Sequence, residues 1–121
     1  MNIKRKNRIS EEIRKVVSEL LMNGIKDPRV SSMTTITKVD VTGDLRYVNI
    51  YVSVLGDKIA KEETLEGLES AKGYIRMEIG NNIDLRYIPE PIFHLDDSIE
   101  QGIYISQLIE KVKEDEEKRG E

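Results

Sequence analysis

The stretch from Thr64 to Asn82 most constrains how this chain folds, because the segments before and after it need a surface to pack on. Apolar residues recur there at helical spacing, on the side that also carries Lys72, and form a stripe along one face: Leu65, Leu68, Ile75 and Ile79. Gly73 interrupts the helix, where a glycine costs about 1 kcal/mol relative to alanine but lets the backbone bend. We therefore predict two turns of helix on each side of Gly73, with a break at Ala71-Lys72-Gly73.

The same break places positive charge beside a helix start. Lys72 and Arg76 are four residues apart and would stand on one side of the second helix. The free N–H groups at a helix start favour an anion such as phosphate. The pattern indicates a phosphate-binding corner, and its alternative is a tolerated glycine on a solvated helix with ordinary surface charges.

Composition limits the chain to one domain with a single two-layer core. It has 121 residues, of which 38% are hydrophobic and 35% charged, and no cysteine. Disulfides and thiolate chemistry are thereby excluded, which fits a reducing cytoplasm. No apolar run approaches the roughly 18 residues of a membrane span, and the start has no apolar segment typical of a signal peptide. We expect a cytoplasmic protein without a membrane partner.

Charge is distributed unevenly along the chain. The net charge is −4, yet residues 1–30 hold eight Lys or Arg against four Asp or Glu, and residues 96–121 hold four against nine. A protein with a basic amino-terminal segment and an acidic remainder can bind a polyanion in one orientation only. The balance argues against a nonspecific nucleic-acid binder, which is usually basic overall.

An amphipathic helix is predicted at the start, ending at Gly24 before the turn Asp27-Pro28-Arg29. Its apolar face has the spacing of a core-facing helix: Ile9, Ile13, Val16, Val17, Leu20 and Leu21. Four cations lie in or just before its first turns: Lys4, Arg5, Lys6 and Arg8. They can follow a phosphate backbone, or they can be the solvated end of a fraying helix.

Two strands follow and form an antiparallel hairpin around Thr42-Gly43-Asp44. In the first strand Thr37, Val39 and Val41 alternate with polar residues. In the second strand a run of β-branched residues alternates in the same way and completes one apolar face: Val48, Ile50, Val52 and Val54. The opposite face carries Tyr47 and Tyr51, which either stack on bases or serve as half-exposed cross-strand partners.

A third strand is predicted from Ile88 to Leu95. Pro89 and Pro91 favour an edge position, with Phe93 and Leu95 facing the helices. Ser98 and Gln101 have capping-box spacing before a last helix, whose apolar face is Ile105, Leu108, Ile109 and Val112. The acidic end from residue 113 is expected to be a mobile tail. The order helix, strand, strand, helix, broken helix, strand, helix predicts an α+β sandwich of two layers.

Catalytic and metal-binding residues are sparse. His94 is the single histidine, which excludes a His-based metal cluster and a conventional serine triad. Its position favours a strand residue with a satisfied hydrogen bond. Asp96-Asp97 can begin a cation site, but they precede a helix, where acidic residues are favoured anyway. We expect no cofactor, no metal and no catalysis.

With these features in place, the chain resembles the ribosome-binding factor A family over residues 4–109. The segments that carry the resemblance match in order and spacing: Arg5, Arg8-Ile9, Asp27-Pro28-Arg29, Asp44-Leu45, Val52-Ser53-Val54-Leu55-Gly56, Ala71-Lys72-Gly73-Tyr74-Ile75-Arg76, Leu85-Arg86, Pro89-Glu90, Phe93, Asp96 and Ser98. The resemblance implies a type II KH-like domain over residues 1–112, followed by the acidic tail 113–121. It also implies a kink at Ala71 and Gly73, where KH modules carry a GxxG loop.

Two positions depart from the family's pattern. Pro91 stands where the family usually has an aliphatic residue, which puts the start of the third strand in doubt. Gly67 adds a second glycine to the first half of the helical pair, so that half is expected to be looser than usual.

The resulting hypothesis is a noncatalytic, monomeric factor that binds immature small-subunit (30S) ribosomal RNA. Its RNA-binding residues would be Lys4, Arg5, Lys6, Arg8, Arg29, Lys72, Gly73, Arg76 and Arg86. The cations of the first helix and those of the break are expected to converge on a single landing place for the RNA. The family resemblance supplies the identity of the RNA as 16S rRNA, together with 5′-end processing and cold adaptation. An alternative is an adaptor whose acidic carboxyl-terminal helix binds a basic ribosomal protein or a GTPase, and a third hypothesis is a nuclease using Asp96 and Asp97.

Overall fold

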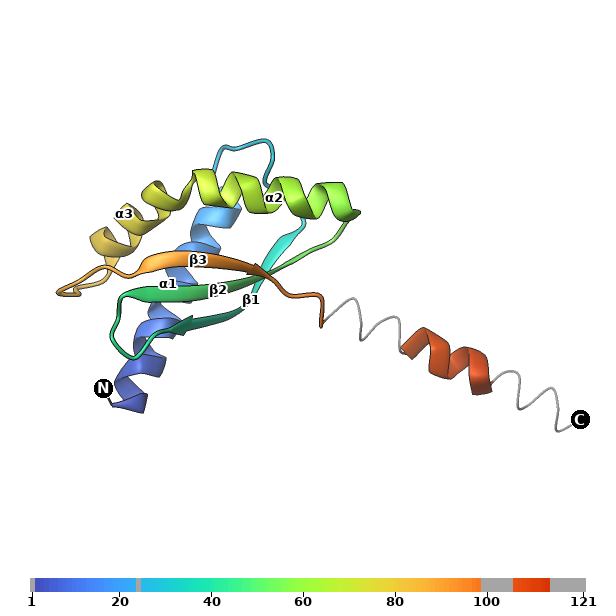
Figure 1. The fold of residues 1–121 in the computed structure, drawn as a ribbon, viewed down its shortest axis with the longest axis horizontal. Helices are drawn as coiled ribbons and strands as arrows, with labels where there is room; N and C mark the ends of the chain where they lie inside the picture. Colours follow the sequence, from blue (N-terminus) through green and yellow to red (C-terminus); the bar gives the residue numbers. More distant parts are fainter. Residues whose placement is uncertain (1, 24, 99–105, 114–121) are drawn as a thin grey trace, which may run out of the picture.

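The protein is a two-layer α+β sandwich (Figure 1). The computed structural model describes residues 2–23, 25–98 and 106–113. Its elements follow in the order α1 (Ile3–Asn23), β1 (Thr34–Val41), β2 (Tyr47–Val54), α2 (Lys58–Ser70), α3 (Lys72–Asn82) and β3 (Glu90–Leu95). The predicted fold class and the order of these elements are confirmed.

The sheet has the order β1-β2-β3. β1 and β2 pair antiparallel, whereas β3 pairs parallel to β2 after a crossover through α2 and α3. β3 is therefore an edge strand, as its prolines predict. It begins at Glu90 rather than at Ile88, and Pro91 is buried opposite Val48.

The core lies between the sheet and the helices. The alternating residues of β2 and four residues of the predicted α1 stripe are buried in one cluster with Leu68, Ile75 and Ile79: Val48, Ile50, Val52, Val54, Ile9, Ile13, Val17 and Leu20. The other two residues of that stripe, Val16 and Leu21, are partly buried against the cluster. Fully burying one such side chain stabilises the fold by about 1.5–3 kcal/mol. The two periodicities in the sequence thus account for the layer that holds the molecule together.

β1 differs from its prediction at Thr37. The register shifts between Ile36 and Lys38, so that Ile36 pairs with Val52 and Val39 with Ile50. Ile36 is consequently buried in the core, while the Thr37 hydroxyl donates to Asp96 Oδ2 at 2.6 Å. The prediction that Thr37 belongs to the apolar face is wrong, because a β-bulge changes the alternation at that point.

The break between α2 and α3 lies at Ala71, which has φ −85° and ψ 0° and caps both helices. α2 begins at Lys58, behind an Asp57 cap that accepts the Ala60 N–H at 2.8 Å, so the first half is longer than the two turns predicted. Gly73 lies inside the first turn of α3, and a Cβ there would meet nothing within 4 Å. The break is confirmed, but the bend does not depend on that glycine.

Gly67 makes the first half tighter than expected, not looser. It is buried, and a Cβ at this position would lie 2.7 Å from Val30 Cγ2 and 3.3 Å from the Val30 backbone nitrogen. Glycine is needed here because the loop after α1 approaches the α2 backbone closely.

Residues 106–113 are helical, and all of them are exposed, including Leu108, Ile109 and Val112. The predicted apolar face thus does not pack on the sandwich over these residues. Gln101, Ile105 and the tail from residue 114 lie outside the described residues. Among the helices in the described ranges, none is long and apolar enough to cross a membrane.

Candidate nucleic-acid interface

The four predicted cations at the start of the chain all lie in the first two turns of α1. Lys6 forms an ion pair with Asp40 of β1, with 3.2 Å between Nζ and Oδ1. Lys4, Arg5 and Arg8 are exposed. Lys6 is therefore paired with a carboxylate, whereas the charged groups of Lys4, Arg5 and Arg8 face solvent.

Arg5 and Arg8 line a groove between α1 and the turn that follows α3. The other wall of this groove is formed by Asn82, Ile83, Asp84 and Leu85. Farther along α1 the groove is lined by Glu12, Lys15 and Glu19, so its positive end coincides with the start of the helix. Phosphate would be favoured at that end and opposed at the other.

Lys72, at the first turn of α3, is held by two carboxylates. Its Nζ lies 3.3 Å from Glu69 and 3.0 Å from Glu90, and its side chain is only 25% exposed. The hydrogen bond to Glu90 is the main reason that the pKa of Lys72 is raised. A phosphate would have to compete with both carboxylates for this ammonium group. Sequence spacing reveals Glu69 but not Glu90, which the fold brings in from β3.

Arg76 is one helical turn farther along α3 and is anchored differently. Its Nε and Nη2 donate to the Ile88 carbonyl oxygen at 3.2 and 3.1 Å, while the residue as a whole stays exposed. This contact fixes the guanidinium over the loop before β3 without neutralising its charge. Arg76 therefore keeps its charge available to a phosphate, and its orientation is set in advance.

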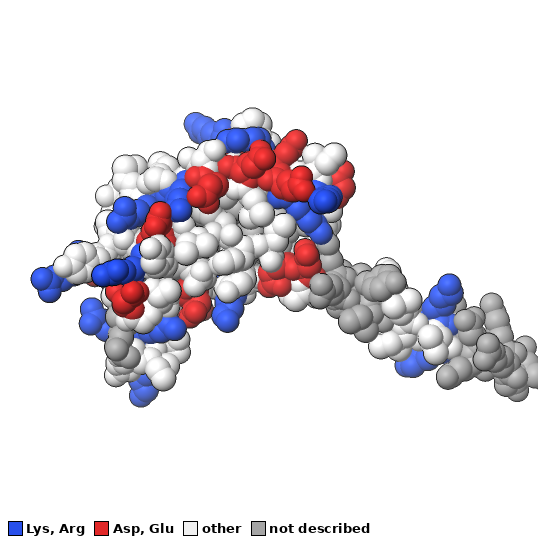
Figure 2. All heavy atoms as spheres, in the orientation of Figure 1, with Lys and Arg blue, Asp and Glu red and all other residues white. Residues whose placement is uncertain are grey.

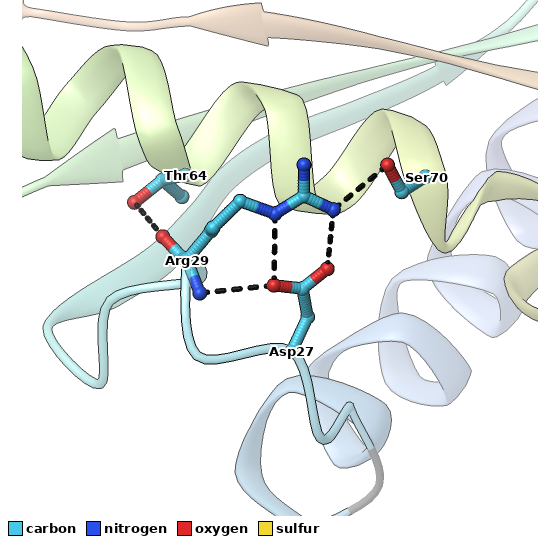
Figure 3. Close-up of polar contacts among 4 residues, drawn as sticks. All are labelled: Asp27, Arg29, Thr64 and Ser70. Atoms are coloured by element: carbon cyan, nitrogen blue, oxygen red, sulfur yellow. Dashed lines mark hydrogen bonds and ion pairs between the residues drawn. The ribbon is translucent and has the colours of Figure 1, made fainter.

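Arg29 acts as a structural clamp (Figure 3). Its Nε and Nη2 donate to the two carboxylate oxygens of Asp27 at 3.0 and 2.7 Å, and Nη2 also donates to Ser70 Oγ at 2.9 Å. The side-chain hydrogen bonds from Arg29 lower the pKa of Asp27 to about 2. Because Ser70 ends α2, this clamp ties the loop after α1 to the break at Ala71. The turn Asp27-Pro28-Arg29 alone does not predict this partner.

Gly73 and Arg86 complete the predicted set. Gly73 is exposed on α3 next to Lys72. Arg86 lies in the loop between α3 and β3, with its guanidinium carbon 5.5 Å from the centre of the Tyr87 ring. Tyr87 did not figure among the predicted residues, because a lone exposed tyrosine has no distinguishing spacing in the sequence.

The structure arranges these cations along α3 and not at one point. Arg5 and Arg8 meet the carboxyl end of α3, while Lys72 begins it, and 11 helical residues span about 16 Å. On the face shown in Figure 2, Lys and Arg side chains lie among Asp and Glu side chains. The geometry fits a polyanion that runs along α3 better than one that is gripped at a single spot.

The residues of the nuclease alternative have other partners. Asp96 accepts hydrogen bonds from the Thr37 hydroxyl and from the Ser98 N–H, and Asp97 lies 3.4 Å from Lys61 Nζ. His94 Nε2 lies 2.9 Å from Asn49 Oδ1, which confirms the hydrogen bond expected of it. Within the described ranges, no three His, Asp or Glu side chains are grouped so as to hold a metal ion.

Fold and surface together define a class. The domain is KH-like, with the type II order of elements. Helices α1, α2 and α3 pack on a three-stranded sheet, a lysine lies beside the break between α2 and α3, and cations lie along α3. The chain belongs to the ribosome-binding factor A family, whose model matches residues 5–109.

Relatives and solved structures agree with this assignment. A ribosome-binding factor A from Clostridioides difficile (strain 630) is 61% identical over 110 residues, which cover 91% of this chain and 86% of the relative. The solution NMR structure of a Thermotoga maritima ribosome-binding factor A has a TM-score of 0.68 at 35% identity, covering 78% of this chain and 89% of that one.

A more distant neighbour carries information about its own assembly. It is a homology model of Thermus thermophilus ribosome-binding factor A fitted into a cryo-EM map of a 30S complex, with a TM-score of 0.61. At 18% identity, covering 74% of this chain and 93% of that one, it supports the fold alone.

Proposed function

We propose that this protein binds the free 30S ribosomal subunit through 16S rRNA and assists late maturation of the subunit. In this role it promotes processing of the 5′ end of 16S rRNA and adaptation to cold. Membership of the ribosome-binding factor A family over residues 5–109 is the observation that carries the proposal. The choice of partner follows this family membership, and the 30S complex described for the Thermus thermophilus ribosome-binding factor A is the example that motivates it.

The mechanism needs no covalent step. A factor that binds an immature conformation of rRNA more tightly than the mature one shifts the population between the two. A tenfold preference corresponds to about 1.4 kcal/mol. The protein would act as a monomer in the cytoplasm and would leave when the mature conformation no longer fits its surface.

The contact surface would run along α3. Arg5 and Arg8 would meet phosphates at the carboxyl end of this helix, Arg76 would meet them near its start, and Arg86 would lie between β3 and the RNA. Arg29 would act indirectly, because its hydrogen bonds to Asp27 and Ser70 hold the loop against the break. Lys72 would contribute once a phosphate displaces Glu69 or Glu90.

Crosslinking tests this surface directly. The protein is crosslinked to small subunits from cold-grown cells, and both the contacted nucleotides and the contacted residues are mapped. We expect contacts with 16S rRNA at the start of α1 and along α3, and none at the exposed Lys58 at the far end of α2. Crosslinks confined to ribosomal proteins, or centred on Lys58, would contradict the proposal.

One observation favours a second candidate, an adaptor that binds a ribosomal protein or an assembly GTPase. Residues 106–113 form a helical segment on which Leu108, Ile109 and Val112 are 44%, 51% and 55% exposed, as an unpartnered amphipathic helix would be. Truncation after Ser98 separates the two candidates. If it abolished subunit binding while reversal of Arg5 and Arg8 left binding intact, the adaptor would be the better account.

A further inference from the structure

A second groove combines exposed aromatic rings with guanidinium groups. It lies between the β1–β2 turn and the loop before β3, which Figure 1 shows at the same end of the sheet. Tyr47, 42% exposed, and Tyr87, 66% exposed, line it together with Arg46 and Arg76. Large apolar rings left in contact with water, beside cations, are typical of sites that stack nucleic-acid bases.

The walls of this groove are tied together. The Glu90 N–H donates to the Arg46 carbonyl oxygen at 2.8 Å, and Arg76 donates to the Ile88 carbonyl oxygen from α3. The turn contains Leu45 with φ 61°, a left-handed conformation that is costly for a residue with a Cβ. A conformation of this kind persists only where the surroundings fix it, so the groove is formed before any ligand arrives.

Charges in the groove leave its guanidinium groups available. Asp44 accepts the Thr42 hydroxyl at 2.7 Å and the Arg46 N–H at 3.1 Å, and Glu90 forms an ion pair with Lys72. Both carboxylates thus have partners within the protein. Arg46 has a side chain that is 79% exposed and lies 3.8 Å from Asp44, too far for a strong pair. Arg86 sits over the Tyr87 ring, where it adds to the positive potential.

We propose that this groove holds an unpaired nucleotide of the bound RNA, whose base stacks on the Tyr87 ring beside Tyr47. Arg76 and Arg86 would face the flanking phosphates. The proposal rests on the proposed function and deepens it, because it names a site for single-stranded RNA at one end of the cationic surface. Stacking tolerates any base, so the site would recognise an unpaired nucleotide and not a sequence.

The test uses a short single-stranded RNA that carries 2-aminopurine, and the same RNA with an abasic residue at that position. The two probes have equal charge and differ only in the base. We expect the protein to quench 2-aminopurine fluorescence and to bind the abasic probe about fivefold or more weakly. Tyr87→Ala should abolish the quenching and the preference while keeping the salt dependence, and Tyr87→Phe should keep all three.

Ile59→Ala is the control, because Ile59 is a large apolar side chain, 64% exposed, that lies near the start of α2, outside this groove and outside α3. Unchanged thermal unfolding of Tyr87→Ala would show that folding is intact. If this variant quenched 2-aminopurine and favoured the intact probe as the wild type does, the inference would be overturned. Failure of the wild type to bind immature small subunits would instead overturn the proposed function, whatever the oligonucleotides show.

Discussion

At the scale of single residues, two glycines in neighbouring helices have opposite roles. Gly67 permits close approach of Val30, whereas Gly73 has open space around its Cα. From the sequence both are predicted to weaken the helix, and Gly73, which lies beside the cations, is predicted to cause the break. Only the packing of the loop after α1, which depends on distant residues, shows that Gly67 is the constrained position.

We expect Gly67→Ala to lower the free energy of unfolding by about 1–3 kcal/mol, because its methyl group would force Val30 away. Gly73→Ala should leave stability unchanged or raise it by up to about 1 kcal/mol, since alanine is the better helix former. Urea denaturation of both variants measures the difference. A destabilised Gly73→Ala protein would mean that the bend at Ala71 does require the glycine.

A second residue-scale prediction concerns Asp27, whose pKa the Arg29 hydrogen bonds lower from 3.8 to about 2. A lowered carboxyl pKa in the folded state stabilises the fold above the unfolded-state value, and this stabilisation disappears as the pH falls through the folded-state value. The melting temperature of the wild type should therefore fall more steeply between pH 4 and pH 2 than that of Asp27→Asn. Parallel melting profiles over this range would argue against the clamp.

At the scale of elements, the sequence predicts what local periodicity encodes and misses what tertiary pairing adds. The stripe on α1, the alternation in β2 and the edge position of β3 follow from residue spacing alone. The β-bulge at Thr37 does not follow from spacing, because the Thr37 side chain hydrogen-bonds to Asp96, which is 59 residues away in the sequence. The sequence also does not predict that the Lys72 charge at the break is paired, because only the fold brings Glu90 beside Lys72.

This pairing yields a prediction for the start of α3. Replacing Glu90 by Gln should free part of the Lys72 charge and raise affinity for RNA about twofold or more, with a steeper dependence on salt. Glu63→Gln, on the exposed side of α2, removes the same charge away from the break and serves as the control. Equal effects of the two substitutions would indicate that only net charge matters.

At the scale of the whole molecule, the uneven charge along the chain becomes a line of cations that follows α3. The sequence predicts which cations form the proposed interface, because the family motifs and the basic first helix select them. It does not indicate their spacing, since Arg5 and Lys72 meet opposite ends of a helix whose direction depends on the sheet crossover. We therefore predict that these cations bind a single extended polyanion together.

The most direct measurement is the affinity for immature small subunits as a function of salt concentration. We expect Arg5→Glu with Arg8→Glu to weaken binding at low salt and to reduce the log–log slope by about 1.4, because each phosphate that is no longer neutralised accounts for roughly 0.7. The matched control, Lys38→Glu on β1 with Lys58→Glu at the start of α2, makes the same change in net charge at two exposed residues outside α3 and should leave the slope near that of the wild type. Equal slopes for the two double variants would contradict the account.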